Sequence, residues 1–160
     1  MTRLLRWMSL GALFGLMLLT ATQTASAADP MSGKWELNLS NSMYDPGPAP
    51  KSMVRMQAID GDTITVTSDI VDADGQSRQL QYTAKLDGSD YPIIGALNAD
   101  TIALKRIDAR TLEFKQKKGG RTTLTGKHQV SDDGSELSIS AKGKNAKGEE
   151  VSDLMVFDKR

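Results

Sequence analysis

Gly33-Lys34-Trp35-Glu36-Leu37-Asn38-Leu39 is the stretch of this sequence that decides its fold. Trp35, Leu37 and Leu39 alternate with polar residues, which is the two-residue period of a strand with one buried face. The residues downstream read almost entirely as further strands. We therefore expect a barrel that closes over Trp35, and we assign this tryptophan a structural role as a plug at the closed end.

The later strands are predicted from alternating polarity and from the turn residues between them. Turn signals recur throughout, no segment keeps a helical period, and consecutive strands are joined by short connections. These features predict an all-β chain that forms a single antiparallel up-and-down β-barrel of about 8–10 strands. The predicted strands after the first are 54–59, 63–71, 79–86, 101–107, 111–117, 121–130, 135–142 and 149–157, with 87–90 as a turn and 91–95 as an edge or a packed loop.

The second predicted strand, 54–59, has two chemically different faces. Val54, Met56 and Ala58 lie on one face, and Arg55 and Gln57 lie on the other. Before it, residues 40–51 contain three prolines in a short span, which removes backbone donors and excludes both helix and central strand. We expect an irregular flap over the surface there.

Residues 1–27 have the pattern of a secretory signal peptide. Arg3 and Arg6 supply a positive start, 10–19 is an apolar run, and Ala25-Ser26-Ala27 offers the small residues that a signal peptidase needs. The apolar run is shorter than the roughly 20 residues that span a bilayer. We predict cleavage after Ala27, a single domain over 28–160, and a periplasmic or secreted location; a retained N-terminal anchor is the alternative.

Composition excludes several classes of function. Without Arg3 and Arg6, the chain after residue 27 has 18 basic and 20 acidic residues, a net charge of −2, which does not favour nucleic acid or an anionic membrane surface. The absence of cysteine excludes thiolate chemistry and a lipid-anchoring thiol. His128 is the only histidine. We therefore expect no metal, no cofactor and no stable membrane insertion, while the sequence leaves the oligomeric state open.

Both ends of the predicted barrel resemble a known superfamily. Gly33-Lys34-Trp35-Glu36-Leu37, followed by Ser40-Asn41-Ser42-Met43-Tyr44-Asp45, resembles the opening of the calycins, which include the lipocalins and the fatty-acid-binding proteins. Residues 156–160 are similar to the closing strand of the fatty-acid-binding branch, and 90–108 resembles small exported bacterial proteins described as lipocalin-like. The resemblance implies a lipocalin-like barrel that binds a small molecule.

Two departures from the fatty-acid-binding branch bear on the ligand that this resemblance implies. That branch has a two-helix lid after its first strand, where this chain has the proline-rich flap. It also holds a carboxylate with an Arg-x-Tyr pair on the last strand, where this chain has Met155-Val156-Phe157. The resemblance therefore does not extend to a fatty-acid clamp of that type, while it is compatible with a less polar ligand.

Three polar side chains lie on predicted inner faces and are the candidate ligand contacts. Arg106 shares a face with Leu104, His128 shares one with Val130, and Tyr82 lies between Leu80 and Ala84. A few polar groups in an apolar wall are typical of a binding cavity. Structural explanations compete: Arg106 as a cation that reaches solvent at the rim, His128 as part of the barrel wall, and Tyr82 as a core residue with a bonded hydroxyl.

Two functions remain open at this stage. The first is a binding protein that holds a small apolar or amphipathic molecule in the barrel. The second is a structural or interaction protein, for example an inhibitor of an envelope protein, with a filled barrel and functional loops. No catalytic residues are assigned, because no nucleophile motif accompanies His128 and the paired carboxylates lie in turns.

Overall fold

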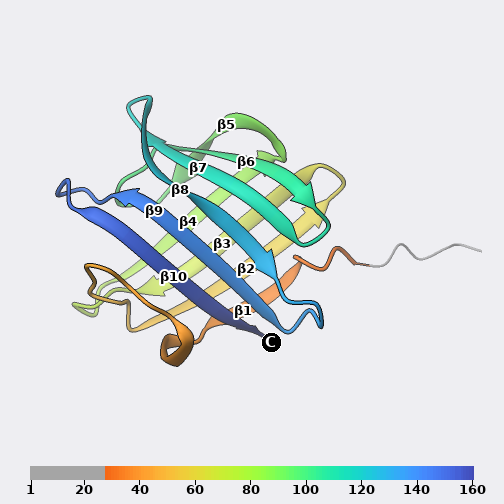
Figure 1. Cartoon of the computed structure of the whole chain (residues 1–160), viewed down its shortest axis with the longest axis horizontal. Helices are drawn as coiled ribbons and strands as arrows, with labels where there is room; N and C mark the ends of the chain where they lie inside the picture. Colours follow the sequence, from red (N-terminus) through yellow and green to blue (C-terminus); the bar gives the residue numbers. More distant parts are fainter. Residues whose placement is uncertain (1–27) are drawn as a thin grey trace, which may run out of the picture.

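A computed structural model describes residues 28–160 and shows a closed antiparallel barrel of ten strands with one short 3₁₀ turn (Figure 1). The prediction of an all-β up-and-down barrel is confirmed. The elements are β1 (Gly33–Leu37), η1 (Leu39–Asn41), β2 (Ser52–Asp60), β3 (Thr63–Val71), β4 (Ser77–Lys85), β5 (Asp87–Ile94), β6 (Thr101–Asp108), β7 (Thr111–Lys118), β8 (Arg121–Val130), β9 (Glu136–Lys144) and β10 (Glu150–Lys159).

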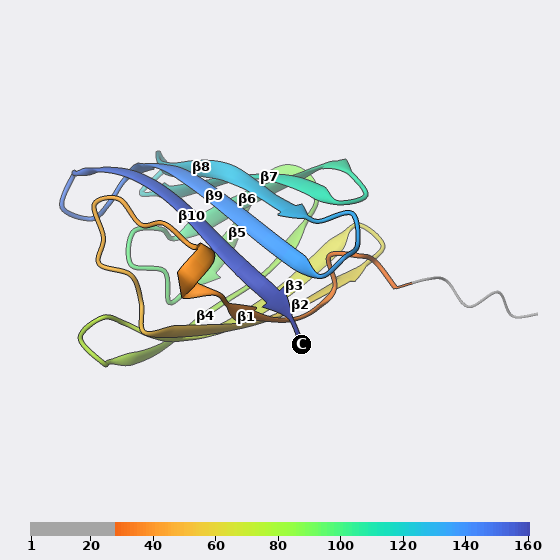
Figure 2. The same cartoon turned by 60° about the horizontal axis from the view of Figure 1, so that its bottom comes forward.

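Each strand pairs with its neighbours in sequence, and β1 closes the ring by pairing with both β2 and β10. Trp35 of β1 is in register with Arg55 on one side and with Lys159 on the other. The first strand ends at Leu37, earlier than the alternation predicts, because the 3₁₀ turn η1 begins at Leu39. Figure 2 shows this turn and the following flap beside β10. Met43 of the flap is bonded to Leu154 of β10.

Nine of the ten strands were predicted from the sequence, and β5 is the one that was not. Residues 87–90 were expected as a turn and 91–95 as an edge or loop, because Gly88 and Pro92 disfavour a strand. In the structure, the amide of Ile93 donates to the carbonyl of Asp100 before β6. Backbone donors alternate sides along a strand, so the nitrogen of Pro92 faces β4. The β4–β5 pairing comprises only the Gln81–Ile94 and Tyr82–Ile93 pairs, and a missing donor there is tolerated.

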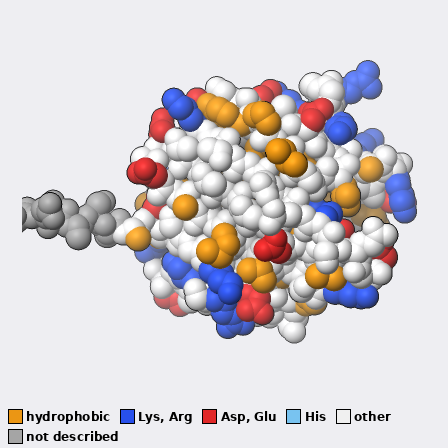
Figure 3. Space-filling view, turned by 180° about the vertical axis from the view of Figure 1, so that it is seen from behind, with side chains coloured by type: hydrophobic (Ala, Val, Ile, Leu, Met, Phe, Trp, Pro, Cys, Tyr) orange, Lys and Arg blue, Asp and Glu red, His pale blue; other side chains and the backbone are white. Residues whose placement is uncertain are grey.

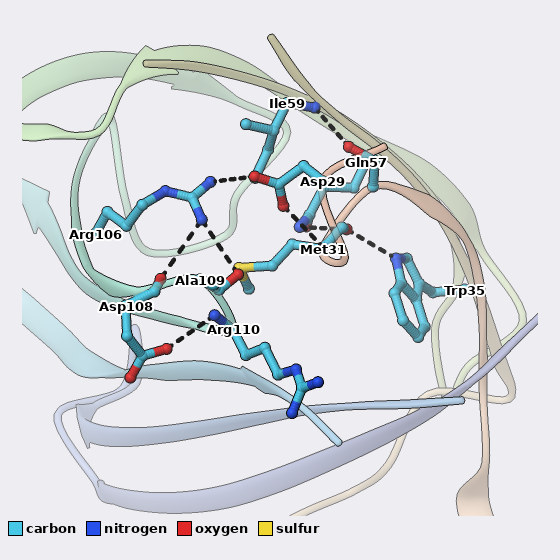
Figure 4. A network of polar contacts seen from close by, with 10 residues as sticks. Asp29, Met31, Trp35, Gln57, Ile59, Arg106, Asp108, Ala109 and Arg110 are labelled. Carbon is cyan, nitrogen blue, oxygen red and sulfur yellow. Dashed lines mark hydrogen bonds and ion pairs between the residues drawn. The ribbon is translucent and has the colours of Figure 1, made fainter. Parts of the chain in front are cut away.

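A short N-terminal segment, residues 29–32, seals one end of the barrel (Figure 4). Met31 and Trp35 are fully buried there, and the indole nitrogen of Trp35 donates to the carbonyl oxygen of Met31 at 3.3 Å. The side-chain amide of Gln57 donates to the same carbonyl at 2.9 Å, and the amide of Ile59 donates to Ser32 Oγ at 2.9 Å. This end is therefore closed by main-chain contacts as well as by two large side chains.

Met31 offers a direct test of this closure. Met31→Ala removes a fully buried side chain from the seal, so we expect a loss of unfolding free energy of about 2–5 kcal/mol. Met56→Ala is the matched control, because Met56 is half exposed on the outer wall, and its effect should stay within about 0.5 kcal/mol. Urea unfolding of the two variants measures both values. Equal effects would show that residues 29–32 do not contribute to the stability of the barrel.

Candidate functional site

The end of the barrel opposite the N-terminal segment is open and forms a mouth of about 710 Å³. The flap, the β3–β4 turn, the β5–β6 loop and the β9–β10 turn surround it (Figure 1). The flap contains two cis X-Pro bonds, Asp45-Pro46 and Gly47-Pro48. The residues around the mouth include Tyr44, Pro48, Asp72, Leu97, Asn145 and Asp153.

The surroundings of two ionisable groups on the wall of the mouth, Tyr44 and Asp153, raise their pKa values. Burial, and then the charge of Asp153, raises the pKa of Tyr44 to about 12. Burial also raises the pKa of Asp153, although its carboxylate accepts a hydrogen bond from the amide of Asp45 at 3.1 Å. The hydroxyl of Tyr44 is buried and has no hydrogen-bond partner among the described residues. The wall of the mouth thus combines apolar surface with a buried unpartnered hydroxyl and a carboxylate.

A second cavity of about 100 Å³ lies inside the barrel, and it shares Met53 and Met155 with the mouth. Methionine side chains are flexible and polarisable, which suits a movable wall between two spaces. The rest of the interior wall is largely apolar and includes Ile70, Leu80, Ile102, Leu124, Ile139 and Phe157. A small molecule that entered at the mouth would therefore meet the two methionines and then this interior.

The polar side of the interior cavity is built from β2, β3, β4 and β8. Arg55 is only 5% exposed; its Nε donates to Gln57 Oε1 at 2.9 Å, and its Nη2 donates to the hydroxyl of Tyr82 at 2.8 Å. Ser68 lies opposite Arg55 in the β2–β3 ladder. The hydroxyl of Ser68 and Nδ1 of His128 are buried without a hydrogen-bond partner among residues 28–160.

The sequence did not identify Arg55 as an interior residue. On β2 the polar face, with Arg55 and Gln57, points into the barrel, while Met56 is half exposed. The apolar alternation of Val54, Met56 and Ala58 would place the opposite face inside. The inversion is possible because Arg55 and Gln57 find acceptors in Gln57, Tyr82 and the carbonyl of Met31. Arg55 is in register with the buried Trp35, but this pairing is not readable from the local sequence of β2.

The three predicted contact residues lie in two different places. Tyr82 and His128 are buried and line the interior cavity together. Arg106 lies at the sealed end, where Nη2 pairs with Asp29 Oδ2 at 2.7 Å and Nη1 donates to the carbonyl of Ala109 at 3.3 Å (Figure 4). Arg106 therefore anchors the N-terminal segment and does not line the cavity. Trp35 lies in the same seal, where its indole nitrogen donates to Met31.

The imidazole of His128 is neutral at physiological pH. Burial, and then the positive charge of Arg55, holds its pKa well below the usual 6.5. The ring lies 5.2 Å from the ring of Phe114, centroid to centroid, at a tilt of 46°. His128 and Ser68 form no hydrogen bond with each other, and no carboxylate is bonded to His128 within the described part of the chain. The arrangement of a serine-histidine nucleophile is not present there.

The outer wall of β6–β9 has another hollow, of about 560 Å³, bordered by lysines. Lys117 pairs with Asp90 at 2.7 Å and Lys127 pairs with Glu113 at 3.4 Å, and these pairs are partly exposed. Exposed lysines are readily solvated, and the buried unpartnered polar atoms of the described chain all lie elsewhere. On the opposite face, Figure 3 shows hydrophobic side chains scattered without one large patch. The interior and its mouth are therefore the candidate site.

Two other properties of the described residues bear on this site. Within residues 28–160 no helix has the length and hydropathy to cross a bilayer. The same residues contain no group of three or more acidic, histidine or cysteine side chains that could hold a metal ion.

Comparison with known proteins supports the fold alone. No family model matches the chain, and no curated protein sequence matches it. Among solved structures, the zebrafish ileal bile acid-binding protein in complex with cholic acid is similar, with a TM-score of 0.52 and 13% sequence identity. The match covers 82% of this chain and 99% of that protein. The similarity shows that this chain shares the closed β-barrel fold of that bile acid-binding protein.

The neutrality of His128 can be measured directly, because it is the only histidine in the chain. We expect its imidazole NMR signals not to titrate between pH 7.5 and 6, whereas the urea-unfolded chain should titrate near 6.5. Because the unfolded state then binds a proton that the folded state does not, stability should fall below about pH 6.5, by up to about 1.4 kcal/mol per pH unit. His128→Leu should remove this slope. Titration of the folded chain near 6.5 would contradict the buried neutral state.

Proposed function

We propose that this chain is an exported binding protein, which holds a small apolar or amphipathic molecule in its barrel and catalyses no reaction. The observation that carries the proposal is that the mouth and the interior cavity adjoin, with Met53 and Met155 lining both. An apolar wall with a few placed polar groups is typical of small-molecule sites. The similar zebrafish protein was solved with cholic acid, which supports a barrel of this kind as a container for such ligands.

Tyr82 and His128 are the proposed ligand contacts from the sequence, and both border the interior cavity. Nδ1 of His128 has no partner within the described chain, so a ligand atom is free to bond it. The Tyr82 hydroxyl accepts from Arg55 and keeps its own hydrogen to donate. Arg106 is not part of this proposal, since Asp29 and the carbonyl of Ala109 occupy its guanidinium.

Native mass spectrometry of residues 28–160, purified from an exported preparation without detergent, tests the proposal. We expect a discrete mass adduct that is lost on solvent extraction and returns when the extract is added back. Ser68→Leu should abolish the adduct, because it fills the interior cavity and removes only an unpartnered hydroxyl. Thr65→Leu, on the exposed face of the same strand, is the control and should keep the adduct. An adduct that survives in Ser68→Leu would place the ligand outside the interior.

Export is the second part of the proposal and rests on the sequence of residues 1–27, which lie outside the described residues. Cleavage after Ala27 would leave Asp29, with its ion pair to Arg106, and the buried Met31 in the mature chain. The seal of the barrel would then be complete after processing.

Processing is tested by expressing the full chain in a bacterium and fractionating the cells. We expect the protein in the periplasm or medium with Ala28 as its first residue, by N-terminal sequencing. Ala27→Leu removes a small residue that the peptidase needs and should leave the unprocessed chain at the membrane. A full-length soluble protein in the cytoplasm would contradict export.

The small interior volume favours one other function. A cavity of about 100 Å³ is below the roughly 300–1,000 Å³ of typical ligand pockets, so the barrel interior is nearly filled by side chains. The chain would then be an interaction protein of the envelope whose mouth loops contact a partner. A bare polypeptide mass, unchanged after incubation with lipid and aromatic extracts, would favour that function over ligand binding.

A further inference from the structure

The barrel interior contains one charge that residues 28–160 do not neutralise. Arg55 is buried, and its two side-chain hydrogen bonds go to Gln57 and Tyr82, which are both uncharged acceptors. None of the ion pairs among the described residues involves Arg55. A guanidinium stays protonated in proteins, and a buried cation without an anion is costly. The remaining N–H groups of Arg55 are therefore available for an anionic acceptor.

Other polar side chains line the same cavity. Ser68 lies beside Arg55 in the β2–β3 ladder, and its hydroxyl is buried without a partner in the described chain. The hydroxyl of Tyr82 accepts from Arg55 and keeps a hydrogen to donate, and the unpartnered Nδ1 of His128 can carry the proton of the neutral ring. All four side chains line the interior cavity. An oxyanion fits this set of donors, because it accepts several hydrogen bonds and supplies the missing charge.

We infer that Arg55, Tyr82, Ser68 and His128 form an anion-binding site in the interior, which takes the carboxylate of a small organic monoanion. This inference rests on the proposed binding function and specifies the ligand. Arg55 is the one cation among these four side chains, since His128 is held neutral, so a single negative charge is matched and a dianion is not. The interior accommodates the head and adjoining atoms, and the apolar remainder lies past Met53 and Met155 toward the mouth.

Matched probes that differ only in charge test the site. Isothermal titration of the extracted protein compares octanoate with 1-octanol, and 2-naphthoate with 2-naphthol. For at least one pair we expect the wild type to bind the acid ten times or more tightly than the alcohol. Arg55→Met should abolish this preference while alcohol binding remains, because methionine keeps an apolar side chain of similar length. Arg110→Met is the control, since Arg110 pairs with Asp132 and lines neither the interior nor the mouth, and it should keep the preference.

A second variant, Tyr82→Phe, tests the site independently in case Arg55→Met does not fold. Tyr82→Phe keeps the ring and loses only the hydroxyl, and we expect it to weaken acid binding about three- to tenfold with little change for the alcohol. Equal affinity of the wild type for acid and alcohol would overturn the anion site and leave the proposed binding function intact. Preference for the acid that persists in Arg55→Met would place the anion elsewhere and overturn the site as well. Binding of none of the four probes would overturn both the site and the proposed function.

Discussion

The pairing of β1 with both β2 and β10 is the constraint on which the rest of this structure depends. It closes the ring, and it fixes Trp35 in register with Arg55 and with Lys159. The ammonium of Lys159 lies 5.0 Å from the centre of the Trp35 ring, and the indole nitrogen donates to Met31. Because the same five-residue strand joins the first and last parts of the barrel, the seal at one end and the polar interior next to it depend on a single strand and its two ladders.

Much of the fold could be predicted from the sequence because most strands carry a simple alternation. β3 is the clearest case: Ile64, Val66, Ser68 and Ile70 are buried, and the threonines and Asp69 between them lie outside. The sequence did not predict β5 as a strand, because Gly88 and Pro92 are locally typical of turns. The short β4–β5 pairing nevertheless tolerates both residues. That tolerance depends on the partner strand, which local sequence does not report.

The candidate site was only partly predictable, for a similar reason. Tyr82 and His128 follow the apolar period of their strands, and the structure places both in the interior. Arg55 and Gln57 break the rule that the apolar face points inward, and their burial becomes possible only through Tyr82 and Met31, which are distant in sequence. Arg106 follows the period but lies at the sealed end, where its pairing with Asp29 removes it from the cavity.

Arg55 and Arg106 together show how the two ends of the barrel differ. Arg106 has a carboxylate partner at 2.7 Å and contributes to the seal, where its role is structural. Arg55 is more deeply buried and has only uncharged partners within the described chain. Stability alone would favour an apolar side chain at position 55, since replacing buried charges with well-packed apolar groups is often neutral or stabilising. A charge that costs stability, in a cavity that opens toward a mouth, is better explained by what it binds than by what it supports.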